Sequence, residues 1–125
     1  MYLCPMTGQV CTGFLQLLSP EITNVPITTY PLPQRQEVVI GRDPSCQIAL
    51  RPNHYLNVSR RHATIRPVQF QENGTLGWEI CDLKSVNGTF INGQYLRGCR
   101  KLFSGDRIRL GQDGPQFLFE SLHQQ

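Results

Sequence analysis

Residues 78–94 read WEICDLKSVNGTFINGQ and contain two strand-type runs, each followed by an Asn-Gly pair. Trp78 and Ile80 lie two positions apart, which is the period of a strand that packs one face against a core. The Asn-Gly pairs at 87–88 and 92–93 supply the positive φ angles that tight turns require. This stretch therefore predicts short antiparallel strands joined by turns.

Short apolar runs bounded by turn residues continue along the rest of the chain. A third Asn-Gly pair lies at 73–74, and the chain contains 11 Gly and 9 Pro but no helix-type runs rich in Ala, Leu, Glu and Lys. Runs spaced about 8 to 12 residues apart are typical of an all-β sandwich or barrel. The predicted strands are 14–18, 27–32, 37–41, 46–50, 62–68, 78–83, 89–91, 106–111 and 117–122.

The length of 125 residues fits one domain, which buries roughly two thirds of the surface that the unfolded chain exposes. We predict that residues 14–121 form this domain. Residues 1–13 have no periodicity and are expected to be a flexible N-terminal extension, and residues 122–125 a C-terminal tail. The sequence contains no internal repeat, low-complexity segment or second domain.

The charge distribution is a weak indication of anion recognition. The 12 basic and 9 acidic residues give a net charge of +3, which falls short of a surface that coats nucleic acid. Ten of the basic residues are arginine, whose planar fork suits carboxylate or phosphate. Solvated strand faces and loops remain the simpler explanation for any single arginine.

The five cysteines are irregularly spaced, and the chain starts without the pattern of a secretory signal, so we expect reduced thiols and a cytoplasmic protein. Cys4 and Cys11 lack a nearby CxxC motif or histidine pair, and we predict neither a metal site nor a cofactor. No apolar run approaches the roughly 20 residues of a membrane helix, so no membrane contact is expected.

Three polar stretches, 40–43, 58–63 and 82–93, follow or border predicted strands, where a rigid sheet usually holds binding loops. A phosphate monoester carries about −1.5 to −2 charges and three acceptor oxygens, so its site needs guanidinium, hydroxyl and N–H donors together. These stretches provide such a set in Arg42, Ser59, Arg60 and Arg61. The neutral amide of Asn87 both donates and accepts, which suits a peptide backbone.

Each of these residues also has a purely structural interpretation. Arg42 follows an ordinary strand end, and Ser59 can cap a turn through its own backbone. Arg60 and Arg61 can point to water, and the Asn-Gly pair at 87–88 can form a simple hairpin turn.

Four motifs in order resemble the forkhead-associated (FHA) domain family. They are Gly-Arg at 41–42, Ser-Arg-x-His at 59–62, Asp-x-x-Ser-x-Asn-Gly-Thr-x-x-Asn-Gly at 82–93 and Gly-Asp-x-Ile-x-Leu-Gly at 105–111. Each motif is weak alone, but the four together form a strong signal that covers roughly residues 14–120. The resemblance implies a two-sheet antiparallel β-sandwich of about eleven strands with its binding loops at one end.

The resemblance also implies a phosphothreonine-dependent interaction module, not an enzyme, whose partner is a phosphothreonine-containing protein. The implied phosphate-binding residues are Arg42, Ser59, Arg60 and Arg61, of which Arg61 is the least certain because it can face the peptide or solvent. Asn87 would hold the peptide backbone, and the implied loop-shaping residues are Gly41, His62, Gly88 and Thr89. Val86 stands where a hydroxyl can add a phosphate contact in some members.

The site requires Arg42 and Ser59 at the same end of the sandwich, whereas a simple up-and-down meander would separate them. The eight residues from Arg51 to Val58 can span about 26 Å at ~3.3 Å each, enough to return along a strand. The spacing permits the two residues to meet.

The sequence also permits three functions other than phosphopeptide binding. A basic β-barrel could bind single-stranded nucleic acid by stacking bases on Tyr55, Trp78 or Phe90. Catalysis would use Ser59 as nucleophile and His62 as base, with Asp82 orienting, but the Gly-x-Ser-x-Gly elbow is absent and His62 is better explained as a structural histidine. A third alternative is an FHA-like module that has lost phosphate recognition.

Overall fold

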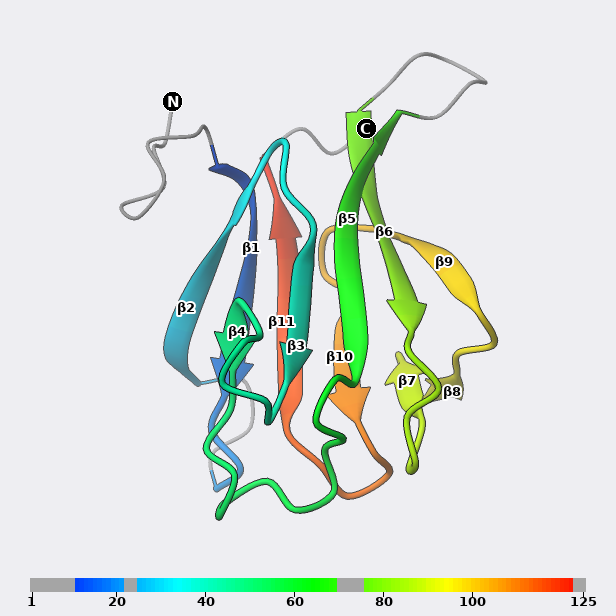
Figure 1. Cartoon of the computed structure of the whole chain (residues 1–125). Coiled ribbons are helices and arrows are strands. Elements are labelled where there is room, and N and C mark those ends of the chain that lie inside the picture. Colours follow the sequence, from blue (N-terminus) through cyan, green and yellow to red (C-terminus); the bar gives the residue numbers. More distant parts are fainter. Residues whose placement is uncertain (1–10, 22–24, 70–75, 123–125) are drawn as a thin grey trace.

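The computed structural model describes residues 11–21, 25–69 and 76–122 (Figure 1). Within these residues the chain forms eleven strands and no helix, so no helix in this part of the chain could cross a membrane. The strands are β1 (Cys11–Leu18), β2 (Pro26–Pro33), β3 (Val38–Gly41), β4 (Ile48–Ala49), β5 (Ala63–Gln69), β6 (Leu76–Asp82), β7 (Thr89–Ile91), β8 (Gln94–Tyr95), β9 (Cys99–Leu102), β10 (Arg107–Leu110) and β11 (Gln116–Ser121).

The strands form two sheets. The six-stranded sheet has the order β2-β1-β11-β10-β7-β8, and the five-stranded sheet has the order β4-β3-β5-β6-β9. Neighbouring strands are antiparallel except for β3 and β4, which pair in parallel through Ile40 and Ile48. The predicted sandwich of about eleven strands is therefore confirmed, with one parallel pair that the sequence did not predict.

The core lies between the sheets. Trp78 and Ile80 are buried as predicted, and in β10 Ile108 and Leu110 are buried while Arg109 between them is exposed. The other fully buried large apolar side chains come from both sheets and the loops at one end: Leu15, Leu32, Ile40, Val58, Ile65, Ile91, Phe117 and Phe119.

The strand pairing brings several loops to one end of the sandwich, which we call the loop end (bottom of Figure 1). Strand β5 starts where β3 and β6 finish, because Ala63 pairs with both Ile40 and Asp82. Strand β4 runs parallel to β3, so the chain leaves both strands at the same end. Parallel pairing, rather than a long return after Arg51, therefore brings Arg42 and Ser59 to one end.

The cysteines differ from the prediction of reduced thiols. Cys81 and Cys99 lie directly opposite each other on β6 and β9, with their Cα atoms 4.0 Å apart, and form a disulfide. They are 18 residues apart in sequence, and only the strand register makes them neighbours. Cys46 is buried and free, and Cys4 lies outside the described residues.

The predicted turns and boundaries have mixed outcomes. Positions 92 and 93 both have positive φ and join β7 to β8 as predicted, whereas the pair at 87–88 lies in a connection between the two sheets rather than in a hairpin. The pair at 73–74 lies outside the described residues. Strand β1 begins at Cys11, inside the segment assigned to the N-terminal extension, of which residues 1–10 are not described.

Candidate functional site

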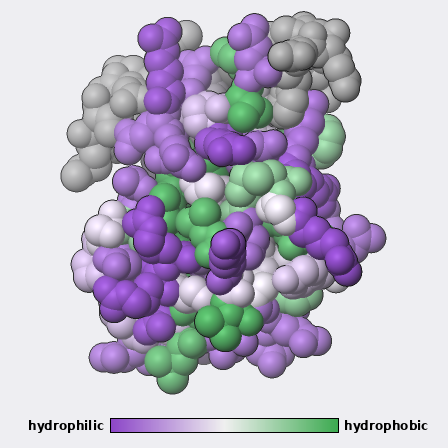
Figure 2. All heavy atoms as spheres, turned by 45° about the vertical axis from the view of Figure 1, so that its right-hand side comes forward, coloured by the Kyte–Doolittle hydropathy of each residue, from purple (hydrophilic) through white to green (hydrophobic). Residues whose placement is uncertain are grey.

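Four segments meet at the loop end: 42–47, 50–62, 83–88 and 111–115. Backbone hydrogen bonds join them, including Arg42 N–H to the Ser59 carbonyl at 3.2 Å and Gly111 N–H to the Gly88 carbonyl at 2.8 Å. The face of the molecule drawn in Figure 2 is mostly hydrophilic, and hydrophobic side chains also appear at its lower end. The exposed apolar residues of these segments are Leu56 and Val86.

Arg42 is held against the segment that carries Ser59. Its side-chain Nε donates a hydrogen bond to the Val58 carbonyl, and its backbone N–H donates to Ser59. Arg42 is half-buried, and its terminal nitrogens form no hydrogen bond with a described residue. Two donor nitrogens therefore remain available for an anion beside Ser59.

Ser59 connects two of the segments. Its Oγ accepts a hydrogen bond from the Val86 N–H at 3.0 Å, across 27 positions of sequence. Because a hydroxyl has one proton as well as lone pairs, Ser59 can still donate outward. The Val86 side chain is 87% exposed, so the residue contributes its backbone here and not its side chain.

Asn87 is exposed at the same place. Its Nδ2 donates to the Asn57 carbonyl at 2.9 Å, which leaves its side-chain oxygen and one N–H for a ligand. The sequence did not identify Asn57 as part of the site, because no motif marks a residue that contributes only its carbonyl.

His62 is fully buried between Ser59 and Gly88. Its Nδ1 accepts a hydrogen bond from the Ser59 N–H at 3.0 Å, so the proton of the neutral ring is on Nε2, which donates to the Gly88 carbonyl at 2.7 Å. Burial lowers the pKa of His62, and the bond to Gly88 and the charge of Asp82 oppose this shift. The neutral ring thus fixes the positions of Ser59 and Gly88.

Asp82 organises the connection from β6 to β7. Its Oδ1 accepts from Ser85 Oγ at 2.6 Å and from Thr89 Oγ1 at 2.7 Å, and its Oδ2 accepts from the Ser85 N–H at 3.1 Å. Burial alone would raise the pKa of Asp82, but these hydrogen bonds outweigh it and lower the pKa. Ser85 Oγ in turn accepts from the Gly88 N–H at 3.0 Å, so a chain of bonds fixes this loop.

The FHA domain model matches residues 38–111, more than half of the chain. The chain belongs to the FHA domain family. The match includes all four motifs found in the sequence, from Gly41 to Gly111.

Solved FHA structures are similar over most of the chain. The FHA domain of yeast Dun1, in complex with a doubly phosphorylated peptide derived from Rad53, is 30% identical, with a TM-score of 0.70 over 100% of this chain and 84% of that one. A structure from a study of phosphothreonine-dependent FHA domain interactions is 30% identical, with a TM-score of 0.65 over 87% and 95%. The MEK1 FHA domain with a phosphothreonine peptide of HOP1 is 25% identical, with a TM-score of 0.68 over 90% and 98%. No curated protein sequence matches the chain.

Two glycines of the FHA motifs stand where a side chain would clash. A Cβ at Gly41 would lie 2.1 Å from the Arg60 carbonyl oxygen. Gly88 has φ of +83°, and a Cβ there would lie 2.7 Å from the Tyr95 ring. Both glycines permit close contacts at the base of the loop end.

The two remaining arginines of the predicted set differ from each other. Arg60 donates to the Asp43 carboxylate at 2.9 Å, although 71% of its side chain is exposed. Hydrogen bonds from Ser45, together with Arg60, lower the pKa of Asp43 to about 2. Arg61 is exposed and forms no hydrogen bond or ion pair with a described residue. The guanidinium of Arg60 is therefore already paired with a carboxylate of the same chain. No sequence pattern predicted this ion pair with Asp43.

The residues considered for catalysis and for base stacking do not have the arrangement that these functions need. His62 bonds to the backbone of Ser59 and Gly88, so neither ring nitrogen is placed to activate the Ser59 hydroxyl. Asp82 bonds to Ser85 and Thr89 instead of orienting His62. Trp78 is buried in the core and cannot stack on a base.

Proposed function

We propose that this chain is a phosphothreonine-dependent interaction module that binds an extended phosphopeptide at its loop end. FHA domains are interaction modules, and FHA structures similar to this chain have been solved with phosphothreonine peptides. The observation that carries the proposal is the hydrogen bond between Ser59 Oγ and the Val86 N–H, because it places a hydroxyl between the Arg42 and Asn87 loops.

The proposed roles follow from the donors that remain available. Arg42 and Ser59 bind the phosphate oxygens, and Arg60 and Arg61 add positive charge around them. Asn87 holds the peptide backbone with its free amide groups. Gly41, His62, Gly88 and Thr89 keep the loops in place.

A binding experiment with one peptide in four forms tests this proposal. A peptide selected from a phosphothreonine library is compared with its phosphoserine, phosphotyrosine and unmodified versions by fluorescence anisotropy. We expect the unmodified peptide to bind at least a hundredfold more weakly, because it lacks several charge-assisted hydrogen bonds of about 1.5 to 3 kcal/mol each. Burial of the threonine methyl, worth about 0.8 kcal/mol, should favour phosphothreonine over phosphoserine roughly fourfold.

Arg42→Ala should weaken binding of the phosphothreonine peptide about tenfold to more than a hundredfold. Arg35→Ala is the matched control, because Arg35 is an exposed arginine between β2 and β3, away from the loop end. Equal binding of the unmodified peptide, or equal affinity of the Arg42→Ala and Arg35→Ala variants, would show that the proposal is wrong. Tighter, salt-sensitive binding of single-stranded DNA would favour the nucleic-acid alternative instead.

A further inference from the structure

A groove leads from the loop end onto the ends of the central strands β1, β11 and β10 of the six-stranded sheet, and we call it the distal groove. It consists of two adjoining cavities of about 420 and 380 Å³. The cavity nearer to the loop end is lined by the segment His54 to Asn57, and the farther one by Leu17, Leu18, Arg109, Gln112 and Gln116. The two cavities share Pro20, Tyr55, Asp113, Gly114 and Pro115.

The distal groove begins at the candidate site. Asn57 lines its near cavity, and the Asn57 carbonyl accepts the hydrogen bond from Asn87. Gly111 lies between the two, because a Cβ there would be 3.3 Å from Asn57 and 3.4 Å from Asn87. A peptide held by Asn87 can therefore continue directly into the groove.

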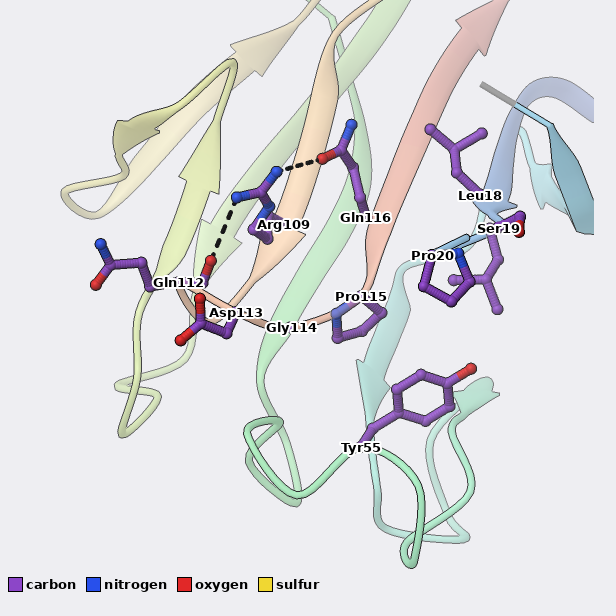
Figure 3. A pocket seen from close by; sticks show the side chains of 11 residues that line it. Leu18, Ser19, Pro20, Tyr55, Arg109, Gln112, Asp113, Gly114, Pro115 and Gln116 are labelled. Carbon is purple, nitrogen blue, oxygen red and sulfur yellow. Dashed lines mark hydrogen bonds between the residues drawn. The ribbon is translucent and has the colours of Figure 1, made fainter. Parts of the chain in front are cut away.

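Arg109 brings a positive charge to the far cavity and forms no ion pair with a described residue. Its Nη2 donates to Gln116 Oε1 at 2.6 Å and its Nη1 donates to the Gln112 carbonyl at 3.3 Å (Figure 3). Both acceptors are neutral, and Arg109 forms no ion pair with a carboxylate among the described residues. The guanidinium is thus oriented in advance by neutral acceptors and not bonded to a carboxylate, which suits a carboxylate from a partner.

The far cavity also has apolar walls, alongside polar side chains such as Gln112 and Asp113. Tyr55 and Pro115 face the cavity across from Leu18 and Pro20 (Figure 3). Asp113, on the loop between β10 and β11, also lines the groove and disfavours a second carboxylate beside it. An acidic side chain on Arg109 with an apolar neighbour against Tyr55 fits this combination.

We propose that the distal groove binds the continuation of the phosphopeptide through an acidic residue that pairs with Arg109. The inference rests on the function proposed above, because Asn87 must first hold the peptide. A compact cavity of this volume is roughly 7 Å across, so an extended chain at about 3.3 Å per residue crosses both in roughly four to five residues. The acidic residue is therefore expected at about that distance from the phosphothreonine.

The test compares a core phosphothreonine peptide with two longer versions, extended by about six residues on the N-terminal or the C-terminal side. Each extension carries glutamates and one leucine at about four to six residues from the phosphothreonine, and a matched version carries glutamine instead. We expect one of the glutamate extensions to bind roughly three- to tenfold more tightly than the core peptide at low salt. The glutamine version should lose most of this gain.

Arg109→Gln should remove the gain while leaving the core peptide's affinity unchanged, and Arg35→Gln should change neither. A core peptide that binds normally but gains nothing from either extension would overturn the distal groove alone. A gain that persists in the Arg109→Gln variant would also overturn it. A core peptide that fails to bind would overturn the proposed function, and the inference with it.

Discussion

Gly41 is the residue at which close packing most directly supports the site. A Cβ there would meet the carbonyl oxygen of Arg60, which also accepts hydrogen bonds from the Asp43 N–H and from the Cys46 thiol. The neighbouring atoms are backbone and cannot rotate away. A side chain at Gly41 would therefore displace the segment that carries Ser59.

Gly41→Ala should reduce the free energy of unfolding by about 1 to 3 kcal/mol, as overpacking usually does. It should also weaken phosphopeptide binding at temperatures where the variant remains folded, because Ser59 moves. Gly105→Ala is the control: Gly105 has φ of +95° but open space around it, on the turn between β9 and β10. That variant should lose stability and keep its affinity. Unchanged affinity in Gly41→Ala would contradict the role given to this contact.

His62 makes the stability of the fold depend on pH. Its Nδ1 faces the Ser59 N–H, so a proton added there would replace a hydrogen bond with a repulsion between two donors. The folded pKa of His62 lies below its ordinary value of 6.5, so the unfolded chain takes up the proton first as pH falls. Stability is complete above pH 6.5 and decreases below it until the lowered pKa is reached.

Denaturant unfolding at about pH 7.5 and about pH 5, without peptide, measures this effect. The free energy of unfolding of the natural sequence should be smaller at the lower pH. His62→Gln should be less stable at both values but should show a smaller difference between them. His54→Gln, which changes an exposed histidine, should keep the full difference. A full difference in His62→Gln would mean that another group is responsible.

Hydrogen bonds at its base hold the connection from β6 to β7 in place. Its geometry depends on Asp82, whose carboxylate accepts three hydrogen bonds from Ser85 and Thr89. The disulfide between Cys81 and Cys99 and the bond from the Asp82 N–H to the Gly98 carbonyl anchor the end of β6 to β9. The loop that carries Val86 and Asn87 is thus fixed from its base.

Asp82→Asn should destabilise the fold by about 1 to 3 kcal/mol, because an amide cannot accept all three bonds and turns one donor toward another. Phosphopeptide affinity should fall as well, since the Val86 N–H and Asn87 lose their positions. Glu79→Gln removes a charge from the same strand but only an exposed ion pair with Arg66, so it should change stability little. Circular dichroism melting and anisotropy on the two variants test this; equal affinity would be evidence against the loop's dependence on Asp82.

Sequence patterns predicted every described strand except β8 and β9, which are two of the four edge strands. Trp78 and Ile80 lie on either side of the charged Glu79, a pattern that predicts a strand with one buried face, and both side chains are buried. Strands β8 and β9 are edge strands whose side chains are mostly exposed or half-buried, so they leave little apolar pattern to detect. The parallel pairing of β4 could not be predicted either, because a two-residue strand carries no sign of its direction.

For the whole molecule, the motif order predicted the family, whereas the contacts between loops came only from the structure. Arg42 and Ser59 were both candidates from their chemistry, but the backbone groups that orient them, the Val58 carbonyl and the Val86 N–H, belong to residues of no distinctive type. The ion pair of Arg60 with Asp43 joins loop residues 17 positions apart, and a backbone hydrogen bond from the Asp43 N–H to the Arg60 carbonyl also joins them. Contacts that are made through the backbone or between distant segments produce no recognisable local sequence motif.

We propose that Arg42 and Ser59 bind the phosphate while Asn87, on the neighbouring loop, holds the backbone of the same peptide. Amide NMR spectra recorded during titration with the phosphothreonine peptide test it most directly. We expect the signals of residues 42–47, 57–62 and 83–88, with the Arg42 Nε–H, to shift together and saturate at one peptide per chain, while the unmodified peptide leaves them in place. Shifts confined to the opposite end of the sandwich, or equal shifts with the unmodified peptide, would contradict it.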